Sequence, residues 1–126
     1  MRLREGGQRG QAAVELVLAL PLLALLALAL LQVGLVVRDQ VLLAHAAREA
    51  ARAAAVDPQP GAARQGALDG SRLDPDRLVV STSGREGRGS TVTADLAYRA
   101  ATDVPLIGPL VGDVPLRASA TMRVEM

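Results

Sequence analysis

The residues best placed to do chemistry are a glycine and a glutamate in front of a long apolar segment. Glu15 lies five positions after Gly10, and the uncharged segment begins at Leu16. A carboxylate near a bilayer is costly unless it has a cation partner or lies at the level of the headgroups. Hydrolysis after Gly10 would create an α-amino group on Gln11, about one helical turn before Glu15. If the chain were cut there, that amine would be the nearest candidate partner for the acid, either within one chain or on an adjacent subunit.

The composition argues against most other chemistry. The chain of 126 residues has no cysteine, one histidine and a formal net charge of +1. This excludes thiol catalysis and disulfides, and the usual structural zinc sites are not expected. His45 has no acid–nucleophile partner nearby in the sequence, and no phosphate-binding loop or cluster of metal ligands is present. We expect no enzymatic activity, no cofactor, no metal and no nucleic-acid partner.

The apolar segment Leu16–Val37 is the length of a membrane span. Its 22 residues carry no formal charge, and as a helix they would extend over roughly 33 Å, close to the hydrocarbon thickness of a bilayer. Arginines dominate the preceding flank, at positions 2, 4 and 9, whereas the following flank has mixed charges. The positive-inside rule then predicts a single-pass protein of the inner membrane, with a cytoplasmic N-terminus and an exported C-terminal part.

Two residues inside this span break its apolar uniformity. Pro21 cannot donate to the carbonyl of Val17, so we expect a kink or a local loosening there. Gln32 is the span's one strong hydrogen-bonding side chain. Two positions are open for it: against a neighbouring helix, or in water near the outer interface.

Helical composition continues beyond the membrane to Val56, where Asp57-Pro58 stops it. A polar stripe is formed by Arg38, His45, Glu49 and Arg52, in which Glu49 and Arg52 form an i,i+3 pair. Beside it, alanine recurs every four residues, a spacing that lets another backbone approach closely. These two rows are Ala46, Ala50, Ala54 and Ala47, Ala51, Ala55.

Taken together, these features resemble two related protein families. The basic leader ending at Gly10, the Glu15 at the fifth position after it and the adjacent apolar helix resemble the signal of type IV pilins. The Ala47-Arg48-Glu49-Ala50-Ala51-Arg52 run, with Pro21 in the span, resembles the TadE-like pseudopilins of Tad (Flp) pili. Here Ala50 replaces the glycine typical of that run, and Gln32 stands where an acid is frequent.

The resemblance implies roles for these residues and a set of partners. A prepilin peptidase would cut after Gly10 and leave Gln11 as the mature N-terminus, and Glu15 would align subunits during assembly. Pro21, Gln32, Arg48, Glu49 and Arg52 would belong to the assembling helix. The implied partners are the bilayer, the peptidase, other pilin or pseudopilin subunits and the pilus assembly platform, and the chain itself could enter the pilus.

The sequence predicts an α+β fold in four parts: a leader (1–10), a transmembrane helix (11–37), its extramembrane continuation (38–56) and a small exported domain (57–126). Alternating patterns predict strands over Arg77–Thr82, Thr91–Arg99 and Leu116–Val124, which form an antiparallel sheet of about three strands covered on one face by a helix. A short helix is predicted over Gly61–Leu68. The apolar, proline-broken loop Val104–Pro115 would lie on the membrane, dock a second pseudopilin or pack against the sheet.

Two functions fit this organisation. In the first, the protein is a minor pseudopilin-like structural subunit of a Tad/Flp-type pilus or a related secretion system. In the second, it is a single-pass anchored binding module that is never processed. The state of the N-terminus separates the two.

Overall fold

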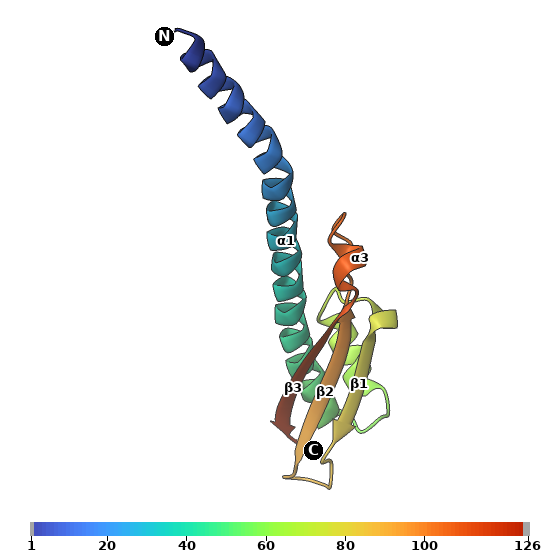
Figure 1. The fold of residues 1–126 in the computed structure, drawn as a ribbon. Coiled ribbons are helices and arrows are strands. Elements are labelled where there is room, and N and C mark those ends of the chain that lie inside the picture. The colour runs from blue at the N-terminus through green and yellow to red at the C-terminus, as the bar shows by residue number, and fades with distance from the viewer. Residues whose placement is uncertain (1, 125–126) are drawn as a thin grey trace.

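The protein is built on one very long helix. The computed structural model describes residues 2–124, with side chains from residue 7 onward, so Met1 of the predicted leader and the leader side chains up to residue 6 lie outside the description. Helix α1 (Arg2–Val56) has 55 residues and a length of about 80 Å. It starts earlier than the expected residue 11, because the leader's Arg, Leu, Glu and Gln also favour a helix. Figure 1 shows that α1 bends in its N-terminal part and that the sheet packs beside its C-terminal half.

Three strands form the predicted antiparallel sheet. Strands β1 (Leu78–Ser83), β2 (Thr91–Ala100) and β3 (Val114–Arg123) are arranged in the order β1-β2-β3. The turn between β1 and β2 has three glycines at positive φ, Gly84, Gly87 and Gly89, as expected for a tight hairpin. Asp95 in the central strand is paired with Ser81 on one side and Ser119 on the other. The predicted α+β fold is therefore confirmed.

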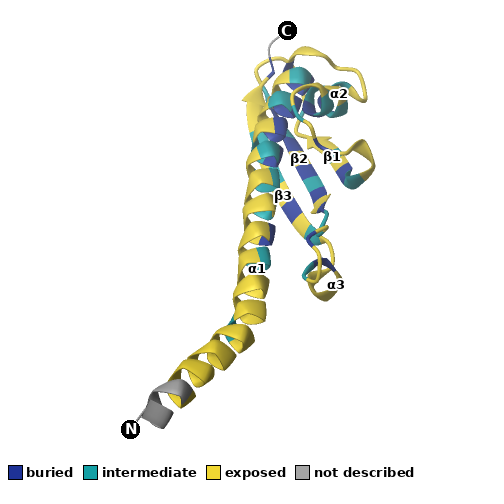
Figure 2. Ribbon diagram, turned by 90° about the horizontal axis from the view of Figure 1, so that it is seen from above, coloured by how far each residue is buried: buried dark blue, intermediate teal, exposed yellow. Residues whose placement is uncertain are grey.

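The core lies between one face of this sheet and the C-terminal half of α1. Strand β2 alternates as predicted, with Val92, Ala94, Leu96 and Tyr98 buried. Both alanine rows of α1 are buried as well, and their small side chains let the helix lie close to its neighbours. In Figure 2 the buried residues of α1 are confined to the half that faces the sheet.

Strand β3 is less buried than its alternation predicts. Leu116 and Val124 are buried, whereas Met122 is 37% exposed and Ala118 and Ala120 are half-buried. Met122 is paired with the buried Val92 of β2, and directly opposite residues lie on the same face of a sheet. The prediction that Leu116, Ala118, Ala120, Met122 and Val124 face inward is therefore confirmed, although Met122 is only partly covered. Strand β3 is at the edge of the sheet, so no further strand lies beside it to cover Met122.

A second, shorter helix completes the layer around α1. Helix α2 (Ala62–Asp69) packs against α1 and lies within one residue of the predicted Gly61–Leu68. Its Arg64 donates hydrogen bonds to the carbonyls of Leu78 and Pro75, each over 2.8 Å. These bonds attach α2 to the start of β1 and to the 3-10 helix η1 (Pro75–Arg77) that precedes it.

The connection between β2 and β3, residues 101–113, projects beyond the sheet. It contains the one-turn helix α3 (Gly108–Val111), which lies at the end of the sheet nearest the N-terminal half of α1 (Figure 1). Leu106, Leu110 and Val111 are exposed here by 65%, 81% and 55%. The expected alternative in which this loop packs against the sheet is therefore wrong for these three side chains.

Candidate assembly and membrane interface

The N-terminal half of α1 has an apolar surface that the chain itself leaves uncovered. Within the described residues, one helix is long and apolar enough to cross a membrane; its most apolar 18-residue window has a mean hydropathy of 2.7 and is 0% buried. Leu18, Leu22 and Leu30 are each more than 60% exposed. Such a surface is stable only in lipid or against other apolar helices.

Glu15 lies on this helix, just before the apolar surface. The side-chain amide nitrogen of Gln11 is 3.5 Å from the Oε1 atom of Glu15, which is the outer limit of a hydrogen bond. Among residues 7–124, no cation forms an ion pair with Glu15. The two residues predicted to interact after processing thus lie one turn apart on the same helix face, and the carboxylate is free to accept a stronger donor.

The predicted cleavage point is inside a helix in the unprocessed chain. Gly10 is exposed, and a Cβ atom added there or at Gly7 would meet nothing within 4 Å. These glycines therefore do not serve packing. Each disfavours the helix by about 1 kcal/mol relative to alanine, so they lower the cost of unwinding this segment.

Pro21 lies within α1, which continues through it. The bend of the helix is in the N-terminal part that contains this residue (Figure 1), which agrees with the kink expected from the lost donor and the crowding of the Val17 carbonyl. The bend directs the first turns of the helix away from the axis of the half of α1 that packs against the C-terminal domain.

Gln32 has surroundings that the sequence did not predict. Its side chain is 4% exposed, and neither its Nε2 nor its Oε1 atom has a hydrogen-bond partner among the described residues. Neighbouring Leu31 and Val33 are more than half exposed. The predicted position in water is therefore wrong for the single chain, because the Gln32 side chain is buried. Its predicted contact with a neighbouring helix stays a prediction.

The Arg48, Glu49 and Arg52 group divides between two environments. Arg48 and Arg52 are exposed, and so is His45, whereas Glu49 is half-buried where α1 meets α2. A shallow groove at this junction is lined by Glu49, Arg52 and Asp69. The expected Glu49–Arg52 ion pair is absent among the described residues, because packing against α2 holds Glu49.

Two contacts that hold α1 in place were missed from the sequence. Arg85, in the β1–β2 turn, donates to the carbonyl of Ala54 and, over 3.0 Å, to that of Asp57. An arginine at a helix C-terminus satisfies carbonyls that lack helical partners. Gln40 donates over 3.1 Å to the carbonyl of Arg117 in β3. Neither contact leaves a local sequence signal, since the partners are 28 or more positions apart.

These features define an α+β protein whose one candidate membrane-spanning helix also forms the base of its folded domain. Residues 10–52 match the family described as TadE-like protein, so the similarity lies within α1 and does not include the C-terminal domain. The matched segment starts at Gly10 and includes Glu15, Gln32 and the Arg48–Arg52 group. No curated protein and no solved structure matches the chain. The match indicates a Tad pilus-associated protein.

Proposed function

We propose that the protein is a minor pseudopilin-like structural subunit of a Tad/Flp-type pilus or a related secretion system. In this proposal a prepilin peptidase cuts after Gly10, and the mature helix anchors the subunit in the inner membrane with residues 57–126 outside. The observation that carries the proposal is the division of α1. Its membrane-length half is 0% buried over the most apolar window, whereas its outer half holds the domain's core.

This division matches what an assembling subunit requires. The domain covers only one side of α1, so the apolar half remains free to pack against other helices in lipid. Pilus subunits and the assembly platform would supply those helices. The exposed Arg48 and Arg52 lie on the outer half, where a neighbouring subunit could approach. The role is structural, without catalysis or a cofactor.

Glu15 gives the proposal its mechanism. After cleavage, the α-amino group of Gln11 would carry a positive charge within about one turn of the Glu15 carboxylate. In the low dielectric near the bilayer, an unpaired carboxylate strongly favours a cationic partner. An amine on an adjacent subunit meets that need when the two helices are in register, so charge pairing selects one axial alignment.

The state of the N-terminus tests the proposal directly. Intact-mass spectrometry of the membrane-extracted protein, from cells with and without a prepilin peptidase, should show a chain starting at Gln11 only when the peptidase is present. A Gly10→Val variant serves as the control and should stay uncut in both strains. An unprocessed wild-type chain in both strains would contradict the proposal.

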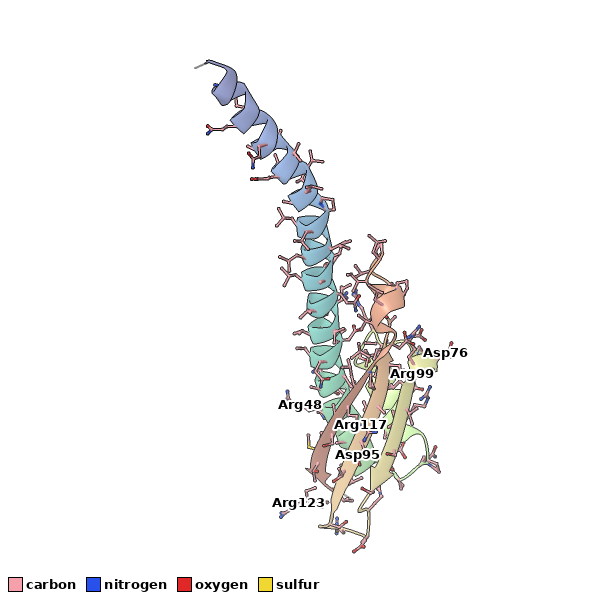
Figure 3. The ribbon with its side chains drawn as sticks, in the orientation of Figure 1. Arg48, Asp76, Asp95, Arg99, Arg117 and Arg123 are labelled. Carbon is pink, nitrogen blue, oxygen red and sulfur yellow. The ribbon has the colours of Figure 1, made fainter. Side chains whose placement is uncertain are left out.

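The alternative is an anchored binding module, and one observation favours it. The face of the sheet opposite α1 has a shallow hollow lined by Ser81, Asp95, Arg117 and Ser119, and Figure 3 shows Asp95 and Arg117 on the sheet. A polar ligand could contact this face while α1 acts only as a tether. An unprocessed chain that remains membrane-bound would support this second function.

A further inference from the structure

The β2–β3 connection, residues 101–113, is a loop held by its own hydrogen bonds, and several of its apolar side chains are exposed. Gly108 donates to the carbonyl of Val104 over 2.8 Å, and the Thr102 hydroxyl donates to the carbonyl of Gly112. A Cβ atom at Gly108 would lie 2.1 Å from the Thr102 carbonyl oxygen, so the base of the loop is tightly closed. Nevertheless Leu106, Leu110 and Val111 remain more than half exposed.

One hydrogen bond gives the height of this loop, that is, its position along the axis of α1. Gln40 of α1 contacts the carbonyl of Arg117, and β3 begins at Val114, three residues earlier. Three strand residues span about 10 Å, which equals about seven residues of helix. Because β3 starts at the end nearer the N-terminal half of α1 (Figure 1), Val114 lies beside the helix at a point between Val33 and Gln40. The loop extends further in that direction, alongside the outer part of the Leu16–Val37 span.

The burial of Gln32 agrees with this height. Its side chain is 4% exposed although Leu30, Leu31 and Val33 around it are more than half exposed. Only one side of the helix is therefore covered at this level. The covered side continues through Val36, which packs against the core cluster, toward the sheet. The exported domain thus reaches down the helix as far as Gln32.

We infer that the β2–β3 loop inserts Leu106, Leu110 and Val111 into the outer leaflet of the membrane that α1 spans. The inference rests on the transmembrane placement proposed for α1. Hydrocarbon that surrounds the exposed face of α1 near Gln32 must also surround a loop at the same height. These side chains therefore contact the acyl chains of the phospholipid bilayer, in the same layer that surrounds the span.

The charges around the loop fit an interfacial position. Asp113, at its base, forms an ion pair with Arg77 over 3.2 Å, and Arg38 follows the span in α1. Arg99 and Asp76 lie at the end of the sheet nearest α3, whereas Arg123 lies at the opposite end (Figure 3). An apolar tip with a charged base is the profile of a segment that inserts its tip below the headgroups and keeps its base among them.

Site-specific fluorescence quenching tests this inference, and the absence of native cysteine makes it practical. The full chain is reconstituted in phospholipid vesicles as three single-cysteine variants, each labelled with an environment-sensitive dye. Leu110→Cys reports on the loop, Leu26→Cys on the span and Val79→Cys on the open face of the sheet; these side chains are 81%, 55% and 66% exposed. Iodide, on both sides of the membrane, quenches from water, and doxyl-labelled phosphatidylcholine quenches from the acyl chains.

We expect the dye at L110C to be quenched by shallow doxyl lipid and to lose most of the iodide quenching measured at V79C. Iodide quenching at L110C equal to that at V79C, with L26C quenched by lipid, would overturn the loop insertion and leave the span in place. Protection of L110C from both quenchers would assign the loop to a second protein surface and overturn the inference too. Iodide access to L26C would refute the transmembrane placement, and loop insertion with it.

Discussion

Gly66 of α2 lies against Ala53 of α1 so closely that a Cβ atom on the glycine would be 2.7 Å from the alanine's Cβ. The same atom would be 2.9 Å from the backbone oxygen of Glu49. Four residues later, a Cβ on Gly70 would be 2.9 Å from the Glu49 side chain. The two glycines therefore let α2 pack directly on the backbone of α1, beside the Arg48–Arg52 segment.

Gly66→Ala should destabilise the C-terminal domain. Overpacking costs about 1–3 kcal/mol, and the better helix propensity of alanine returns about 1 kcal/mol of that. The atoms in the way include backbone, which cannot rotate aside, so we expect a net loss of about 1–2 kcal/mol. Thermal unfolding of the full chain in detergent micelles should show this as a melting temperature lowered by several degrees.

The matched control for this substitution is Gly34→Ala. Gly34 is also helical, but an added Cβ there meets nothing within 4 Å, so this variant should be neutral or slightly more stable. An unchanged or raised melting temperature for G66A would mean that α2 does not sit on α1 as described.

Much of the fold was predictable because it depends on local pattern. The end of α1 at Val56 follows from Asp57-Pro58, and the alternation in Val92, Ala94, Leu96 and Tyr98 gave the buried face of β2. The alanine rows of α1 correctly predicted close approach by another backbone. Residue spacing cannot distinguish a partner subunit from the same chain, however, and here α2 and the sheet cover those rows.

The candidate site was less predictable because its geometry depends on distant residues. The burial of Gln32 depends on residues outside its own stretch of helix, and no pattern near Gln32 indicates it. Arg85 reaches the end of α1 from a turn 31 positions after Ala54. By contrast, Gln11 and Glu15 are one turn apart by helix geometry alone, so their proximity was foreseeable while their assembly role stays a prediction.

Gln32→Leu should stabilise the protein. The buried Gln32 amide has no hydrogen-bond partner among the described residues, and an unsatisfied buried polar group costs about 1–3 kcal/mol. Leucine has a similar size and removes that cost, so the free energy of unfolding in micelles should rise by a similar amount. Chemical denaturation followed by circular dichroism measures the change.

Gln40→Leu is the comparison for this variant. It makes the same substitution on the same helix, but it removes the hydrogen bond to the Arg117 carbonyl and should cost about 1 kcal/mol. A loss of stability in Q32L as large as that in Q40L would indicate that the Gln32 amide has a partner in the folded protein.

Leu106→Asn should relieve backbone strain in the β2–β3 loop. Leu106 has a φ of 69°, a left-handed conformation that costs most L-residues about 1–2 kcal/mol but that asparagine adopts more readily. Leu106→Asn and Leu110→Asn both place a polar side chain in the loop proposed to insert in lipid, so this cost is shared. We expect the free energy of unfolding in micelles to be higher for L106N than for L110N by about 1 kcal/mol. Leu110→Asn is the control, since it removes another exposed leucine of the same loop from the α3 helix and relieves no strain. Equal effects of the two variants would rule out strain at Leu106.

Glu15→Ala should leave membrane insertion intact and impair assembly. The substitution removes a charge next to the apolar segment, which makes insertion easier, but it also removes the acid that would pair with a neighbour's α-amine. Carbonate extraction should therefore still find the variant in the membrane fraction, while the amount recovered in sheared pili falls well below wild type. Glu15→Gln keeps the side-chain size and should fail in the same way. Glu5→Ala removes an acid that processing would discard, so its assembly should be normal. Wild-type pilus incorporation of E15A would show that alignment of the subunits does not depend on this carboxylate.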